Sequence, residues 1–200
     1  LPEHWELMER FGQSAGVGAS LLAGGNFEDF DRLIAEGLVH QQTEIDGVRA
    51  TAEHYPKGHS GRYALKLAAG PERGRETPRV VSETPVQIRT GPVRVEPGQV
   101  IHISFWLRIP NKIVSNLDGV VIYDSVGGAE QALRLNGPVP GWTQYQLLRE
   151  VRESSDLTLT LALAGLGEVL IDDVAITAYG PQVRAEPLVS APAIGQDAGQ

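Results

Sequence analysis

The stretch of sequence that most constrains the fold is residues 157–177, where apolar side chains alternate with small or polar ones. Leucine occupies every second position from 157 to 163, and this period of two is typical of a strand with one face in a core. Gly165 and Gly167 then interrupt the pattern, and closely spaced glycines are typical of a tight reversal. The sequence therefore predicts two antiparallel strands joined by a short glycine turn.

The second of these predicted strands carries a carboxylate among apolar residues. Asp172 alternates in phase with Leu170, Val174 and Ile176. Burying an ionised carboxylate is costly unless it is neutralised or hydrogen-bonded, so Asp172 needs a partner. It could accept backbone N–H bonds at the rim of a sandwich, bind a structural calcium ion, or act as a catalytic acid, although no second carboxylate lies at a suitable spacing.

The rest of the chain repeats the strand pattern. The 200 residues include 23 Gly and 13 Pro, which favours a β-rich chain with many turns. Clear alternation marks further strands at 48–54, 63–68, 100–110, 119–124, 129–135 and 142–150. Roughly nine to eleven short strands at regular spacing predict an all-β, antiparallel jelly-roll β-sandwich.

The two ends differ from this body. In residues 1–19, Trp5, Met8 and Phe11 have helical spacing before a Gly-rich stretch, which predicts a short N-terminal helix and a linker. From residue 180 the chain loses periodicity and gains Pro, Ala and Gln, which indicates a disordered C-terminal tail or a linker. We therefore expect a leader at 1–19, a sandwich domain at 20–179 and a flexible segment at 180–200.

Composition excludes several classes of function. A net charge of −8 disfavours nucleic acid and anionic membranes as partners, and no apolar stretch is long enough to span a bilayer. With no cysteine, the chain has no disulfides, thiolate catalysis or Cys-type zinc sites. Because the sequence begins without Met and without a signal-peptide pattern, we expect a piece of a longer protein.

Five motifs, in this order and spacing, resemble the carbohydrate-binding modules of families 4/9 and 22, which are galactose-binding-domain-like sandwiches. The motifs are Asn26-Phe27-Glu28, Ser60 to Leu67, Pro97-Gly98-Gln99 leading to Ile103-Ser104-Phe105-Trp106, Gly141-Trp142, and Ile171-Asp172-Asp173-Val174. The resemblance covers about residues 20–179. It implies a two-sheet jelly roll, no catalysis, and a structural Ca²⁺ near the ends of the domain.

The resemblance also implies which residues hold that ion. They are the Asn26 carbonyl, the Glu28 side chain, Asp172 and a carbonyl from the loop Ser60–Tyr63. Two hard carboxylates with carbonyl oxygens suit calcium, and the ion would tie the first strand to the last.

Sugar binding on such a fold requires aromatic rings for pyranose faces, with amides and charged groups for hydroxyls. The outward row of the strand 100–110 supplies His102, Ser104, Trp106 and Arg108, and we expect Tyr123, Gln146, Thr158 and Thr160 on the same concave sheet. Trp142 and Phe105 are predicted to be core residues. Trp106 could instead cover the sheet beneath a loop or a neighbouring domain.

Two functions compete on this evidence. The first is a non-catalytic module of a larger extracellular or cell-surface protein, binding a polysaccharide or oligosaccharide with modest affinity. The alternative is a structural or interaction domain that has lost sugar binding and packs on a neighbouring domain of its parent protein. An enzyme would require paired carboxylates or a Lys, Tyr and His set on the concave sheet, and the sequence shows neither.

Overall fold

The computed structural model describes residues 19–180, which form two large antiparallel sheets and a small two-stranded one. The predicted leader helix and linker, residues 1–18, and the predicted tail, residues 181–200, lie outside this range. The described strands are β1 (Val39–Gln42), β2 (Val48–Pro56), β3 (Tyr63–Pro71), β4 (Val86–Arg89), β5 (Val93–Val95), β6 (Val100–Ile109), β7 (Val114–Asp124), β8 (Leu133–Leu135), β9 (Val139–Glu150), β10 (Ser155–Leu157) and β11 (Leu159–Tyr179). The helices are α2 (Phe30–Ala35) and the 3₁₀ turn η1 (Ala129–Gln131).

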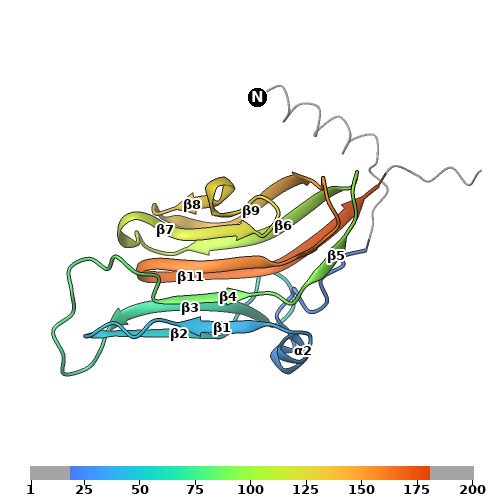
Figure 1. The fold of residues 1–200 in the computed structure, drawn as a ribbon. Helices are drawn as coiled ribbons and strands as arrows, with labels where there is room; N and C mark the ends of the chain where they lie inside the picture. Colours follow the sequence, from blue (N-terminus) through green and yellow to red (C-terminus); the bar gives the residue numbers. More distant parts are fainter. Residues whose placement is uncertain (1–18, 181–200) are drawn as a thin grey trace, which may run out of the picture.

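Each of the two large sheets, A and B, contains five strands, and β11 is the middle strand of both, whereas β5 and β10 pair with each other in the small sheet. Sheet A has the order β1-β4-β11-β7-β8, and sheet B has the order β2-β3-β11-β6-β9. In Figure 1, β11 crosses the centre of the molecule, with β1 to β4 below it and β6 to β9 above it. The predicted β-sandwich is therefore confirmed, whereas the strand predicted at 129–135 is replaced by η1 and the short β8.

The glycine turn predicted inside residues 157–177 is wrong, because β11 continues through it for 21 residues. Its first part pairs with β4 and β7, and from Gly167 onward it pairs with β3 and β6. A Cβ on Gly165 would lie 2.7 Å from Ile113 Cγ2 and 2.8 Å from Ser115 Cβ, so only glycine fits beside that segment. The two glycines therefore let one strand pass from one sheet to the other.

The core lies between the inward faces of the two sheets. Phe105 and Leu107 from β6, Leu67 from β3, and Leu161 and Leu163 from β11 are all completely buried. Phe105 is thus a core residue, as predicted. This apolar layer follows directly from the period of two, since alternate residues of each strand face inward.

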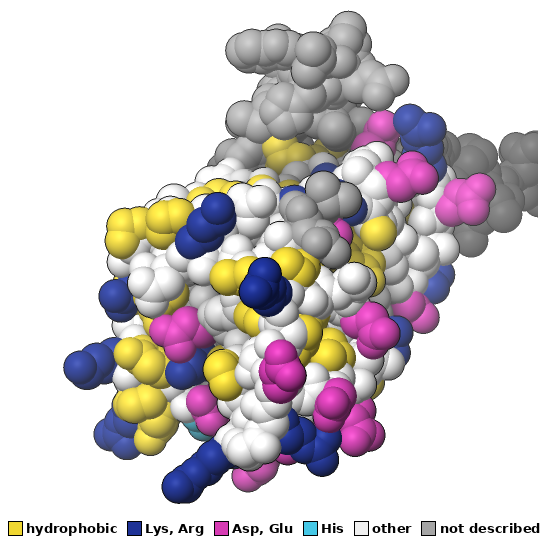
Figure 2. All heavy atoms as spheres, turned by 90° about the vertical axis from the view of Figure 1, so that its left-hand side faces the viewer, with side chains coloured by type: hydrophobic (Ala, Val, Ile, Leu, Met, Phe, Trp, Pro, Cys, Tyr) yellow, Lys and Arg dark blue, Asp and Glu magenta, His cyan; other side chains and the backbone are white. Residues whose placement is uncertain are grey.

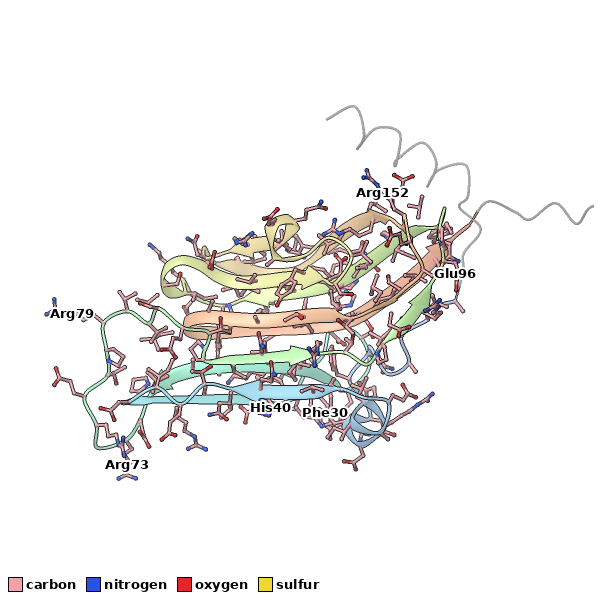
Figure 3. The ribbon with its side chains drawn as sticks, in the orientation of Figure 1. Phe30, His40, Arg73, Arg79, Glu96 and Arg152 are labelled. Carbon is pink, nitrogen blue, oxygen red and sulfur yellow. The ribbon has the colours of Figure 1, made fainter. Side chains whose placement is uncertain are left out.

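Helical structure is a minor part of the described chain. Helix α2 has six residues, and its N-cap Asp29 accepts a hydrogen bond of 3.0 Å from the Arg32 N–H. Phe30, at the start of α2 (Figure 3), contacts the His54 ring of β2 edge-on at 4.2 Å between centroids. Within residues 19–180, no helix has the length and apolar character needed to cross a membrane.

The surface at one end of the sandwich is mixed in charge. Figure 2 shows that acidic and basic side chains alternate there with apolar ones, without a large patch of one sign. Arg73 and Arg79 extend from the long loop between β3 and β4, away from the sheets (Figure 3). The net negative charge is therefore not concentrated on this end.

A buried ion pair joins the two sheets. The Arg149 Nε of β9 lies 2.7 Å from the Asp124 Oδ2 of β7, and their side chains are 10% and 0% exposed. The other Asp124 oxygen accepts the N–H groups of Val126 and Gly127, and an Arg149 Nη donates to the Gln131 carbonyl at 3.0 Å. Both charges are fully hydrogen-bonded, which offsets the desolvation of the pair.

We expect Asp124→Ala to lower the free energy of unfolding by about 3–5 kcal/mol, because it leaves the Arg149 charge buried and unpaired. Asp118→Ala is the matched control, since its ion pair with Arg134 is solvent-exposed and worth about 0–1 kcal/mol. Urea unfolding measures both values. Similar small losses in the two variants would show that the buried pair does not hold the sheets together.

Candidate functional site

Asp172 lies under a loop on the outer face of sheet B. The loop, residues 57–62, joins β2 to β3 and covers the carboxylate completely. Asp172 Oδ2 accepts the N–H groups of His59 at 2.7 Å and Ser60 at 3.2 Å, and its Oδ1 accepts the Asp173 N–H at 2.7 Å. The first predicted role of Asp172, as an acceptor of backbone N–H bonds, is therefore present in the structure.

The face on which Asp172 lies differs from the prediction. It pairs with Trp106, but the register then shifts at a β-bulge, so that Ala175 pairs with Ser104 and Ile176 with Ile103. The bulge reverses the phase of the strand. Val174 and Ile176 consequently face the core, whereas Asp172 points outward and is buried by the loop instead.

Burial sets the ionisation of Asp172. Desolvation raises its pKa to about 6, the neighbouring Asp173 charge adds to this rise, and the three N–H bonds oppose it. The carboxyl group therefore ionises about two pH units above an ordinary aspartate.

Glu28 holds the same loop from the other side. Its Oε1 accepts the Arg62 N–H at 2.6 Å and the Tyr63 N–H at 2.8 Å, and these bonds lower the pKa of Glu28. Gly61, with φ +60°, passes so close to this carboxylate that a Cβ would collide with Oε1. Asn26 makes only a long contact here, from its Oδ1 to the Glu28 N–H at 3.5 Å.

Three segments meet at this loop, and each contains a strained residue. The described non-glycine residues with positive φ are Phe27 at 51°, Lys57 at 99° and Asp173 at 48°. They belong to the segment before α2, the loop itself, and the bulge of β11. Such backbone persists only where the surrounding contacts over-determine it, so this corner of the domain is tightly specified.

Three oxygen atoms lie close together around Gly58. A Cβ placed on Gly58 would lie 2.5 Å from the carbonyl oxygens of Ser60 and Tyr63 and 2.7 Å from Asp172 Oδ2. Carboxylate and carbonyl oxygens are the ligands that calcium takes. Within the described range, no three His, Cys, Asp or Glu side chains gather around a possible metal position, so a site here would depend on main-chain carbonyls.

The same loop places a histidine on Trp106. The His59 ring stacks on the Trp106 ring at 3.8 Å between centroids and 13° between planes, and it meets Trp142 at 5.9 Å and 71°. His59 Nδ1 lies 2.7 Å from Asp173 Oδ2, and the Ser60 hydroxyl donates to Asp173 Oδ1 at 2.6 Å. Trp106 remains half-buried rather than fully covered.

Trp142 is not a core residue, contrary to the prediction. The pairing of β6 with β9 shifts between Leu107 and Ile109, and Trp142 lies in the extra residues opposite Arg108. A bulge re-aims the side chains around it. Trp142 is therefore half-buried on the outer face beside His59, and Pro140 and Gly141, directly before it, are the signal in the sequence for an irregular strand.

Four of the five predicted ligand residues lie together on sheet B. His102, Trp106 and Arg108 share the outer face of β6, and Gln146 Oε1 of β9 is 3.2 Å from His102 Nε2. Tyr123 does not join them, because β7 belongs to sheet A, where Tyr123 pairs with Thr160. The expectation that all these residues share one sheet is wrong.

The outer face of sheet A carries a row of small side chains between two rows of longer ones. On β11, Thr160 and Ala162 are 5% and 3% exposed, although they face outward. Their neighbours are Arg89 and Gln87 on β4, and Tyr123 and Val121 on β7.

Polar groups continue across this face. The Gln87 amide donates to Gln41 of β1, and Arg134 of β8 lies opposite Val121. Sequence reasoning missed Gln41, Gln87, Arg89 and Arg134. Alternation within 86–89 gives a signal for Gln87 and Arg89, but only the strand order brings them beside Tyr123.

Among the comparisons with known proteins, the one with solved structures gave matches. No protein-family model matches the sequence, and the search of curated proteins found no match. A family 4 carbohydrate-binding module is 12% identical with a TM-score of 0.47, covering 78% of this chain and 99% of that one. The tandem family 22 modules of Paenibacillus barcinonensis Xyn10C are 17% identical with a TM-score of 0.47, covering 86% and 49%.

The family 61 module TmCBM61, solved with β-1,4-galactotriose, is 16% identical with a TM-score of 0.42, covering 78% of this chain and 97% of that one. These solved structures, to which the chain is similar, are carbohydrate-binding modules.

The raised pKa of Asp172 predicts a pH dependence of stability. In the presence of a chelator, Asp172 ionises in the unfolded chain near its ordinary value of 3.8 but in the folded protein only near 6. We therefore expect the free energy of unfolding of the wild type, relative to Asp172→Asn, to fall between about pH 4 and pH 6 and to be constant above. Urea unfolding across this range tests it, and a difference that does not change with pH would contradict it.

Proposed function

We propose that this chain is a non-catalytic carbohydrate-binding module of a larger protein, and that it binds a glycan on the outer face of sheet A. The observation that carries the proposal is the row of small side chains on β11, Thr160 and Ala162, between longer polar and aromatic ones. A sugar chain lying along this row would meet side chains on both flanks.

The side chains on those flanks suit a saccharide. The Tyr123 ring offers a face for a pyranose, and the amides of Gln41 and Gln87 and the guanidinium of Arg89 offer hydrogen bonds to hydroxyls. With a single aromatic ring on this face among the residues that the structure describes, we infer modest affinity.

Sheet B is less suited to an extended glycan. The loop 57–62 lies on its outer face, and His59 occupies one face of the Trp106 ring. Of the predicted ligand residues, Tyr123 therefore keeps its role in this proposal.

Asp172 is not suited to act as a catalytic acid. This carboxyl group has a raised pKa, as a general acid requires, but it has no exposed surface and both its oxygens accept backbone N–H bonds. A substrate could not reach it while the loop is in place. Because polysaccharides are found mainly outside the cell, we infer that the parent protein is exported.

Affinity electrophoresis against soluble xylan, β-1,4-galactan, β-glucan and mannan tests glycan binding. We expect retardation by at least one polysaccharide, and an affinity at least tenfold weaker, or about 1.4 kcal/mol, in Tyr123→Ala. Tyr55→Ala is the control, because Tyr55 lies on β2 of sheet B. If no polysaccharide retards the wild type, the alternative of an interaction domain without a sugar site is favoured.

We also propose a structural calcium ion at the loop 57–62. The Asp172 carboxylate and the carbonyl oxygens of Ser60 and Tyr63 would hold it, and the Glu28 carboxylate, which contacts the same loop, would add negative charge. An ion here would fasten the β2–β3 loop to β11. Its binding requires ionised carboxylates, so it should strengthen as pH rises.

Calcium should therefore raise the melting temperature, more at pH 7 than at pH 5, and magnesium should have little effect because it prefers a strict octahedral site. The variants Glu28→Ala and Asp172→Ala should lose this response. Asp31→Ala, an exposed acidic residue of α2, should keep it. Identical melting curves with calcium and with chelator would refute the site.

A further inference from the structure

We propose that the glycan bound on sheet A is an acidic one, and that the Arg89 guanidinium binds the carboxylate of a uronic acid residue. This inference rests on the function proposed above and narrows its ligand from glycans in general to those that carry a carboxylate. A uronic acid differs from the corresponding neutral sugar in this one group, so the choice between them depends on a charged contact at the site.

Strand pairing places Arg89 and Tyr123 in one row across sheet A. Arg89 of β4 pairs with Thr160 of β11, and Thr160 pairs with Tyr123 of β7 (Figure 1). Neighbouring strands lie about 4.8 Å apart, so the backbones of Arg89 and Tyr123 are about 10 Å apart, with the short Thr160 side chain between them. A pyranose lying on the Tyr123 ring would therefore have its edge within reach of the Arg89 side chain.

The Arg89 guanidinium has no counter-charge in the described part of the chain. Arg89 is the exposed last residue of β4, and within residues 19–180 its side chain forms no ion pair and no hydrogen bond. Arg134, on the same face, is occupied: its Nε lies 3.0 Å from Asp118 Oδ1, and its Nη2 donates to the Ala129 carbonyl at 2.7 Å. Arg89 therefore keeps its five N–H donors for a ligand.

The two rows of outward residues that line the proposed site have no acidic member among the described positions. The members are Val39, Arg89, Thr160 and Tyr123 in one row, and Gln41, Gln87, Ala162, Val121 and Arg134 in the other. The chain has 25 acidic and 17 basic residues, yet both charged members of these rows are arginine. Charges more than about 8 Å away are largely screened at physiological salt, so the local positive charge outweighs the net charge of the chain.

A guanidinium distinguishes a carboxylate from a hydroxyl group. Its planar fork donates two parallel N–H bonds to the two carboxylate oxygens, and such charge-assisted bonds are about twice as strong as neutral ones. The amides of Gln41 and Gln87, which are hydrogen-bonded to each other on the same face, carry no charge. Arg89 therefore supplies a contact that a uronic acid gains over the corresponding neutral sugar.

Isothermal titration of the full chain with matched pairs of oligosaccharides tests this assignment. Each acidic ligand is compared with its carboxyl-reduced form, which has a hydroxymethyl group in place of the carboxylate and the same linkages. The pairs are β-1,4-hexamannuronate with β-1,4-mannohexaose, α-1,4-hexagalacturonate with α-1,4-galactohexaose, and xylohexaose with a glucuronic acid branch or a glucose branch. We expect at least one acidic ligand to bind at least tenfold more tightly than its reduced form, and this ratio to fall as salt is added.

Substitutions at Arg89 separate its charge from its shape. Arg89→Gln should bring the ratio of the two affinities down to about one, because it removes the charge-assisted bonds. Arg89→Lys keeps the charge but loses the planar fork, so it should retain only part of the ratio. Arg49→Gln is the matched control and should leave the ratio unchanged, since Arg49 is an exposed strand residue of sheet B.

The outcomes distinguish this inference from the proposed function. If acidic and reduced ligands bind equally and Tyr123→Ala weakens both, the glycan site on sheet A stands and the carboxylate assignment is overturned. If the preference for the acidic ligand survives in Arg89→Gln, the carboxylate is bound elsewhere and the assignment is again overturned. If the ratio depends on Arg89 but Tyr123→Ala changes nothing, the carboxylate assignment stands and the ring contact falls.

Failure of all the acidic ligands to bind would also overturn the carboxylate assignment. In that case retardation by the neutral polysaccharides still decides whether the chain is a glycan-binding module. The two results are therefore independent of each other.

Discussion

Strand β11 is the constraint on which the rest of the structure depends, because it is the middle strand of both sheets. Its apolar residues face the core, first from sheet A and then from sheet B. The glycines at 165 and 167 let the strand cross between the two sheets. Every other strand of the two sheets pairs with β11 or with one of its neighbours. The position of β11 therefore decides which side chains share an outer face.

The β-bulge after Asp172 interrupts the regular pairing of β11 with β6, and several segments pack together at this point. The buried carboxylate and Glu28 hold the loop 57–62 through its backbone N–H groups, and the loop in turn lays His59 on Trp106. The buried acid with a raised pKa, the loop and the stacked rings of His59 and Trp106 are thus parts of one contact network. Removal of the Asp172 carboxylate would therefore also affect the stacking of His59 on Trp106, since the loop connects them.

The two outer faces differ for a simple steric reason. Sheet A has small side chains on its middle strand, so Thr160 and Ala162 are shielded only by the longer residues of β4 and β7. Sheet B has Asp172 on the same strand, and a loop covers it. The two outer faces thus differ in the side chains that β11 presents and in the loop that covers sheet B.

The sequence by itself determined most of the long strands and many of their inward residues, because alternation of side chains is a local property and the apolar set of each strand is buried in the core. It also determined that Asp172 required partners, and the motifs indicated the fold. Only the tertiary structure decided that Gly165 and Gly167 mark a crossing, that Trp142 faces outward, and that Tyr123 and Trp106 lie on different sheets. These facts depend on strand order and on three register shifts, which arise from pairing between distant segments of the chain.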